Sequence, residues 1–334
     1  MGRVFFPLDD QLESLGGWSE GAVEMVLWTA QAVSSYREAE EALARLSPVS
    51  VSKSQIQRMV EAYGGQLAQQ RQEAGEALWE SGVKGEEAPP PRDGQKERVG
   101  ISLDGMMVWV DDGWHEVKVG SCFTFGPGRH GEVETAEVGY WAWYGDVETF
   151  RQTMWWYAYH RGLGWDGLAV VLGDGATWID GFVETYCPDG VRIVDWYHAL
   201  QHVWTLGKEA FGDHADQWVE KMEQLLWEGR LEEVVAGCEA VLASREHWSD
   251  EAARTANYFR QRADQMRYPA YRQAGYPIGS GTVESGCKGI AWRCRGRGQR
   301  WKTKGLRGML ALRSAAMGGP KEWQWAWQQI RQAA

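Results

Sequence analysis

Residues 99–110 read VGISLDGMMVWV, an apolar run that carries one acid, Asp104, near its centre. A run of this kind, rich in β-branched and aromatic residues, predicts a strand. Two similar stretches follow at 115–125 and 134–143, and they are separated by Asp-Asp-Gly and Gly-Pro-Gly turn sequences. Three consecutive strands joined by short turns predict an antiparallel meander.

After the meander the pattern alternates between helix and strand. Apolar residues repeat at helical spacing over 147–158, and residues 167–173 and 191–194 are short apolar stretches typical of buried strands. Helices are expected from about Thr177 and Tyr197. The order β-β-β-α-β-α-β-α predicts a mixed α/β sheet flanked by helices, and it is the order of RNase H-like folds.

The sheet domain is predicted to occupy 98–204 and 269–320. Residues 205–268 contain no strand pattern and have polar, acidic faces, so we expect an all-helical insertion there. The 1–97 region is predicted to be a small helical region that ends in a Pro/Glu-rich linker near 80–97, because proline-rich polar segments act as extended spacers.

Within this N-terminal region the pattern predicts a helix-turn-helix near 34–64. Ser47-Pro48 ends a helical stretch over 20–46, and a second helix starts near Ser52 or Ser54 and weakens at Gly64-Gly65. A plain helical hairpin is the alternative. In the helix-turn-helix interpretation, glutamine and arginine would contact base edges or phosphates. The candidate DNA-binding residues are Lys53, Gln57 and Arg58.

The net charge of −11 over 334 residues conceals a strong segregation. Residues 285–334 carry 11 Lys/Arg and one acid, whereas the rest of the chain has a net charge of −21. A basic segment on an acidic body indicates a local polyanion site. A solvated basic surface without a partner is the alternative.

The cysteine pattern and the hydropathy of the chain argue against two classes of protein, disulfide-rich domains and membrane-spanning proteins. An odd number of cysteines without a CxxC pair favours reduced structural thiols over a disulfide framework or a zinc knuckle. No stretch approaches the ~20 apolar residues of a membrane span, and no signal-peptide pattern begins the chain. We therefore expect a cytoplasmic, nucleoid-associated protein with no membrane partner.

Three carboxylates lie beside glycines at informative places. Asp104 is inside the first strand, Asp174 follows the fourth, and Glu284 follows the Gly279-Ser280-Gly281 turn. In an RNase H-like sheet the first and fourth strands are neighbours, so Asp104 and Asp174 would face each other. Hard oxygen ligands of this kind suit two Mg²⁺ or Mn²⁺ ions, which support phosphoryl transfer. These acids are the predicted metal ligands and catalytic residues.

His198 is a further catalytic candidate. It lies in the segment Asp195-Trp196-Tyr197-His198, and His202 shares its helical face at i, i+4. The two histidines would supply half of a zinc site, but nothing completes it at the usual spacing. Contact of His198 with phosphate near the metals, or a purely structural histidine, are the open interpretations.

The basic segment supplies the remaining DNA-binding candidates. Its cations would hold phosphates against the active site, and its tryptophans would stack on bases. Core packing is the alternative for any single tryptophan. The candidates are Lys288, Arg293, Arg295, Arg297, Arg300, Trp301, Lys302 and Lys304.

In combination these motifs resemble the DDE transposases, and more narrowly the ISKra-type insertion-sequence transposases. The resemblance covers about 100–310. Its matching residues are Leu103-Asp104-Gly105, Gly173-Asp174-Gly175-Ala176 with Trp178-Ile179, Asp195-Trp196-Tyr197-His198-Ala199, Gly279-Ser280-Gly281-Thr282-Val283-Glu284-Ser285 with Lys288, and Gly298-Gln299-Arg300-Trp301. Relatives often have methionine at the position of Gln299 and a longer N-terminal region.

The resemblance implies an RNase H-like catalytic domain with a helical insertion before the last acid. By position Asp104, Asp174 and Glu284 match the family's metal-binding triad, and Asp195 and His198 match its Asp/Cys-x-x-His motif. It implies DNA partners, namely terminal inverted repeats and target DNA, and a homo-oligomer assembled on DNA. The rival interpretations are another RNase H-like nuclease, a catalytically silent transposase-derived DNA-binding protein, and a defective element fragment.

Overall fold

The computed structural model describes residues 14–15, 17–82, 98–129 and 132–332. The strands are β1 (Ser14–Leu15), β2 (Trp18–Ser19), β3 (Arg98–Val110), β4 (Gly113–Pro127), β5 (Val133–Trp143), β6 (Val170–Gly173) and β7 (Val191–Val194). The helices before the insertion are α1 (Glu20–Ala32), α2 (Tyr36–Leu46), α3 (Lys53–Met59), the π-helical turn η1 (Val60–Gly64), α4 (Gly65–Glu80), α5 (Val147–Tyr159), α6 (Thr177–Tyr186) and α7 (Trp196–Phe211). The remaining helices are η3 (Gly212–His214), α8 (Asp216–Trp227), α9 (Leu231–Leu242), α10 (Asp250–Gln261), η4 (Ala263–Gln265), α11 (Tyr268–Gln273), α12 (Gly281–Cys294), α13 (Thr303–Met317) and α14 (Pro320–Gln332).

The molecule is an α/β protein built on a mixed five-stranded sheet with the order β5-β4-β3-β6-β7. Strands β3, β4 and β5 pair antiparallel, as the meander pattern predicts. Strand β6 adds parallel to β3, and β7 adds parallel to β6. The expected neighbourhood of the first and fourth strands of the sheet is therefore confirmed.

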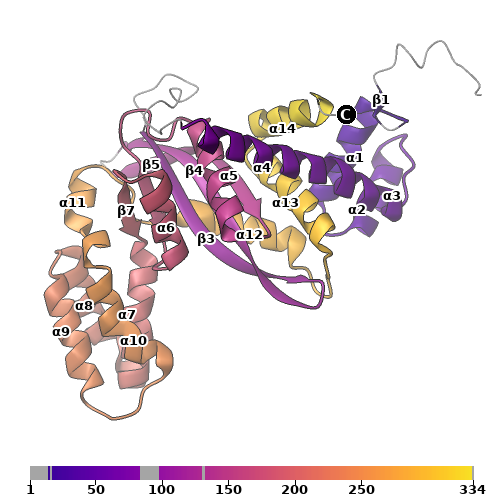
Figure 1. Ribbon diagram of the computed structural model, residues 1–334. Helices are drawn as coiled ribbons and strands as arrows, with labels where there is room; N and C mark the ends of the chain where they lie inside the picture. Colours follow the sequence, from indigo (N-terminus) through magenta and orange to yellow (C-terminus); the bar gives the residue numbers. More distant parts are fainter. Residues whose placement is uncertain (1–13, 16, 83–97, 130–131, 333–334) are drawn as a thin grey trace, which may run out of the picture.

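Helices cover both faces of this sheet (Figure 1). Successive residues of β3 point to opposite faces, because side chains alternate along a strand. Asp104 meets Cys287 of α12 on one face, whereas on the other Gly120 lies against Met154 of α5 and the side chain of Leu103. The acid thus lies on the face that α12 covers.

Helices α7 to α10 form the predicted helical insertion and project away from the sheet beyond β7 (Figure 1). They share one hydrophobic core with the sheet residues Phe123, Leu172 and Val194. The predicted boundary at residue 205 falls inside α7, which begins at Trp196. The insertion therefore continues a helix of the sheet domain without a break.

The N-terminal helices differ from the prediction in two places. The helical stretch over 20–46 is two helices, since the chain breaks at Val33 and Ser35 caps α2. Ser52 caps α3 with a complete capping box, but Gly64 does not end the helix. The chain continues through η1 into α4 up to Glu80, so much of the polar stretch expected to be a spacer is helical. The rest of the predicted linker, at 83–97, lies outside the described residues.

Gly64 allows a close helix crossing, and this explains why it does not act as a helix breaker. A Cβ at Gly64 would lie 2.5 Å from the carbonyl oxygen of Gly308 in α13. A Cβ at Gly308 would meet the carbonyl oxygen of Val60 at the same distance. Only glycine permits this approach of two backbones. Helices α1, α4, α13 and α14 consequently share one core with the sheet.

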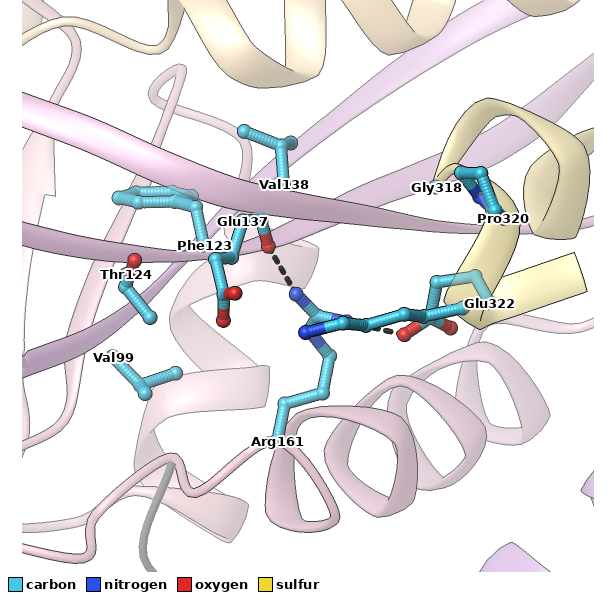
Figure 2. A pocket seen from close by; sticks show the side chains of 10 residues that line it. Val99, Phe123, Thr124, Glu137, Val138, Arg161, Gly318, Pro320 and Glu322 are labelled. Atoms are coloured by element: carbon cyan, nitrogen blue, oxygen red, sulfur yellow. Dashed lines mark hydrogen bonds and ion pairs between the residues drawn. The ribbon is translucent and has the colours of Figure 1, made fainter. Parts of the chain in front are cut away.

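The last helix is tied to the sheet by a buried ion pair. Arg161, just after α5, binds the carboxylate of Glu322 in α14 and the backbone carbonyl of Glu137 in β5 (Figure 2). The Tyr157 hydroxyl also donates to Glu322, at 3.0 Å. A cavity of about 440 Å³ adjoins these groups, and neither Asp104 nor Asp174 lines it. Breaking such a buried pair is costly, so we assign Arg161 and Glu322 to structure.

The five cysteines are free, in agreement with the prediction of reduced thiols. None of the helices in the described residues combines the length and apolar character needed to cross a lipid bilayer.

Candidate functional site

Two of the predicted acids lie side by side at the junction of β3 and β6. The strands are in register at Leu103 and Gly173, so Asp104 and Asp174 are the next residues on each. Asp104 accepts from the Gly105 N–H at 2.7 Å, and Asp174 accepts from the Ala176 N–H at 2.9 Å. Ligand sites in such sheets lie at the carboxyl ends of parallel strands, where Asp174 is found.

The surroundings of Asp104 disfavour the charged form of its carboxyl. Burial raises the pKa of its carboxyl above the usual range, and the negative charge of Asp174 raises it further. The Gly105 N–H, the Cys287 thiol and His198 oppose this shift of the pKa. The charge of Asp174 thus adds to the cost of ionising Asp104, and a bound cation would remove that cost.

Helix α12, which carries Glu284 and Cys287, packs on β3 and β4. Cys287 donates its thiol to Asp104 Oδ2 at 3.6 Å, and Thr282 bonds Ser121 of β4 at 2.8 Å. Glu284 lies one turn before Cys287, is half-exposed, and forms an ion pair with Lys288 at 3.3 Å. Among the described residues no three His, Cys, Asp or Glu side chains are grouped closely enough to enclose a metal ion.

Asp195 joins α7 to the glycine turn that precedes α12. Its buried carboxylate caps α7 by accepting from the His198 N–H at 2.6 Å, and its second oxygen accepts from the Ser280 N–H. A Cβ at Gly279 would lie 3.3 Å from the ring of Tyr197, which is a tight contact. Asp195 is therefore placed to orient the start of α12, and through it Glu284.

His198 and His202 share a face of α7, as their spacing predicts, with ring centroids 5.3 Å apart. His202 stacks on Tyr258 of α10 at 3.9 Å. Burial lowers the pKa of His202 to about 4, and His198 adds to this effect. The Nδ1 atom of His202 and the hydroxyl of Tyr258 are buried and have no hydrogen-bond partner among the residues that the structure describes.

Sequence reasoning missed three contributors to this site. Cys287 gave no motif, and Tyr258 lies in the insertion, far from the acids in sequence. The third contributor is Arg192, which is buried and binds the carbonyl oxygen of Asp174. Its sequence signal is a charged residue inside an apolar strand pattern. A cation at such a place needs a partner, and that requirement was the available clue.

Two predicted DNA contacts are wrong because the side chains are buried. Arg293 donates to the carbonyl oxygens of Ala30 and Ser34 and lies over Tyr36, so it joins α12 to the N-terminal helices. Trp301 donates its ring N–H to the carbonyl oxygen of Cys294 at 2.9 Å. Neither is available to phosphates or bases.

The other basic candidates of the C-terminal segment are exposed. The backbone of Trp301 pairs with Trp109 and Asp111 at the tip of the β3–β4 hairpin, which carries the segment onto that tip. Arg295 lies over Trp114 and Arg300 over Trp109. Trp114 is 51% exposed, and Trp292 is 50% exposed. The exposed cations are Lys288, Arg295, Arg297, Arg300, Lys302 and Lys304. We call this set without Lys288, together with Trp114, the hairpin basic surface.

The predicted contacts of α3 are also exposed. Lys53, Gln57 and Arg58 face away from the core, whereas Ile56 and Met59 are buried. Gln57 binds Glu61 at 2.7 Å, and Arg58 binds the Ser54 carbonyl oxygen at 3.2 Å. Helices α1, α2 and α3 pack on one another, which leaves this face of α3 open to a partner.

No protein-family model matches this chain, and no curated protein matches its sequence.

Proposed function

We propose that this chain is a DDE transposase, a metal-dependent polynucleotidyl transferase with an RNase H-like catalytic domain. It would hydrolyse a phosphodiester bond at each end of a mobile DNA element and transfer the freed 3′-hydroxyl into target DNA. The strand order supports the fold, since β4 runs antiparallel to the other four strands, as in RNase H-like sheets.

The observation that carries the proposal is the pairing of Asp104 and Asp174. They occupy neighbouring parallel strands, and the raised pKa of Asp104 reflects both its burial and the charge of Asp174. Because this arrangement is costly by itself, it favours a function that supplies a cation.

The donor set fits Mg²⁺ or Mn²⁺. Asp104 and Asp174 offer hard carboxylate oxygens, and Glu284 would join them by leaving its exposed ion pair with Lys288. Such an exposed pair is worth only about 0–1 kcal/mol, so little opposes the exchange. When bound, two divalent ions would activate the attacking oxygen and stabilise the leaving oxygen.

The side chains around these acids have supporting roles. Asp195 would hold the start of α12 through the Ser280 N–H, and His198 would contact a phosphate or the scissile strand. Lys288, released from Glu284, would bind a phosphate. The hairpin basic surface would hold flanking DNA, and Lys53, Gln57 and Arg58 would read the terminal repeat.

The test is an assay of cleavage and strand transfer in Mg²⁺, on DNA that carries the ends of the genomic segment encoding this chain. Glu284→Gln is the test variant, and Glu220→Gln, on the exposed face of α8, is the matched control. We expect end cleavage and joining by the wild type and the control, and neither by Glu284→Gln.

The other outcomes identify the rivals. Specific end binding without cleavage by the wild type would indicate a silent DNA-binding protein. Cleavage without preference for the ends would indicate a general RNase H-like nuclease.

A further inference from the structure

The loop that carries Asp174 is held by two arginines from different parts of the fold. One comes from β7 and the other from the end of the helical insertion. Both bind backbone carbonyl oxygens of the loop and the same carboxylate, that of Asp180 in α6. We call Arg192, Asp180 and Arg262 the loop clamp.

Arg192 is the inner arm of the loop clamp. It is buried in β7 and donates to the carbonyl oxygens of Ile193, at 2.6 Å, and of Asp174. Its Nε lies 3.4 Å from Asp180 Oδ1. This arm belongs to the sheet itself, since β7 is the neighbour of β6.

Arg262 is the outer arm and comes from the insertion, directly after α10. It donates to the carbonyl oxygen of Gly175 at 2.5 Å and forms an ion pair with Asp180. Its side chain is only 13% exposed, so the pair is largely desolvated. Gln265 adds a weaker contact with Asp180 at 3.4 Å.

A second contact from α10 reaches the same loop. A Cβ at Gly175 would lie 2.5 Å from the ring of Tyr258, so the ring packs directly on this backbone. The ring of Tyr258 also stacks on His202 of α7. The position of the Asp174 loop is therefore coupled to α10 through two side chains, Tyr258 and Arg262.

We propose that Arg262 is a positioning residue, through which the helical insertion sets the orientation of the Asp174 carboxylate for metal binding. This inference rests on the proposed function. Removing a group that orients a metal ligand without contacting the metal lowers metal affinity by about 10–100-fold. The insertion would then control the metal affinity of the site, although none of its side chains contacts the metal.

The experiment uses the full chain with Arg262→Ala, Arg262→Lys and Arg260→Ala. Arg260 is the matched control, because it lies on α10, is half-exposed and pairs with Glu239 inside the insertion. Hydrogen exchange of the 174–178 amides reports loop position without metal. Titration with Mn²⁺ reports the affinity of the site for this ion, because the electron paramagnetic resonance signal of free Mn²⁺ is lost when the ion binds. Guanidinium is added to Arg262→Ala as a rescue.

We expect Arg262→Ala to speed exchange of the loop amides and to weaken Mn²⁺ binding about tenfold, with partial rescue by guanidinium. The lysine of Arg262→Lys reaches only one of the two acceptors, so its Mn²⁺ affinity should lie between those of the wild type and Arg262→Ala. The Mn²⁺ affinity of Arg260→Ala should match that of the wild type within about twofold. If Arg262→Ala does not fold, the intermediate affinity of Arg262→Lys decides the question.

Two results would overturn the inference, and they are distinguishable. Faster loop exchange with unchanged Mn²⁺ affinity would show that the loop clamp is purely structural. Wild-type protein that binds no Mn²⁺, although Arg262→Ala still alters loop exchange, would instead overturn the proposed function on which the inference rests.

Discussion

At the scale of single residues, the unusual feature is the Asp104 carboxylate, which is partly buried and has few hydrogen-bond donors around it. Asp104 lies inside a strand, and within the described residues its carboxyl accepts hydrogen bonds only from a backbone N–H and a thiol. Sequence pattern alone identified this residue, because an acid within an apolar strand run needs an explanation. Two predictions belong to this scale.

Asp104→Asn should stabilise the metal-free protein at neutral pH. Burial and Asp174 raise the pKa of the Asp104 carboxyl in the folded state. Its contribution to stability is therefore present at acid pH, below the ordinary aspartate pKa, and is lost as the pH rises through the raised pKa. Urea denaturation between about pH 3 and pH 8 should show a gain for Asp104→Asn that shrinks toward acid pH.

Two controls belong with this variant. Asp112→Asn, at a 97% exposed side chain, should leave stability unchanged. Mn²⁺ at 100 times its dissociation constant should stabilise the wild type by about 2.7 kcal/mol, and Asp104→Asn by much less. A variant less stable than the wild type at pH 8 would contradict the assignment.

His202→Phe should make the protein less sensitive to acid. Burial lowers the pKa of His202 from 6.5 to about 4, so the neutral ring contributes stability that is present above pH 6.5. That contribution is lost as the pH falls toward 4, because the unfolded chain takes up the proton first. Phenylalanine keeps the stack on Tyr258 without a titratable group, and thermal unfolding from pH 7 to pH 4 measures the difference.

The exposed His214, in η3, supplies the control for this prediction. His214→Gln should retain the wild-type loss of stability in acid. An equal acid response of His202→Phe and the wild type would show that other groups dominate this pH range.

At the scale of elements, helix packing overrode local sequence preference. A pair of glycines predicted the end of a helix, but tertiary contact kept the chain helical through η1 into α4. The reason is the crossing with α13, where Gly64 and Gly308 bring two backbones together. Helix propensities describe neighbouring residues only, so they do not include a packing partner some 240 residues further along the chain.

Gly64→Ala and Gly65→Ala should have opposite effects on stability. A Cβ at Gly64 collides with the Gly308 carbonyl, so we expect a loss of about 1–3 kcal/mol. A Cβ at Gly65 meets nothing within 4 Å, so alanine should add about 0.5–1 kcal/mol by favouring the helix. The free energy of unfolding from urea denaturation compares the two. Equal effects would show that α13 is not held at this distance.

At the scale of the whole molecule, the charge segregation has a structural outcome. The basic C-terminal segment is distributed between the core and the hairpin basic surface. Arg293 and Trp301 entered the core, whereas Arg295, Arg297 and Arg300 remained outside. The acidic remainder of the chain would repel DNA, so binding should depend on this local surface.

Combined substitution of Arg295, Arg297 and Arg300 by glutamine should weaken DNA binding and flatten its salt dependence. Each lost phosphate contact lowers the slope of log affinity against log salt by about 0.9 on duplex DNA. Binding isotherms at several salt concentrations measure this slope. Arg293→Gln should reduce stability and leave the slope unchanged, because its side chain is buried. A slope that did not respond to the triple variant would place the DNA elsewhere.

The sequence by itself determined the strands of the sheet and the helices that follow them, and it identified the three acids proposed as metal ligands. Periodicity and turn residues act within a few positions, so β3 to β7 could be predicted close to their observed bounds. The insertion and the start of α12 were predictable for the same reason.

Only the tertiary structure decided which charges are buried and which residues support the site. Arg293 binds a carbonyl 263 positions away, Arg262 binds one 87 positions away, and Cys287 reaches Asp104 across 183 residues. Contacts of this range depend on how helices pack on the sheet, and no local pattern encodes them. The same packing turned two predicted DNA contacts into core residues and brought the insertion to the Asp174 loop.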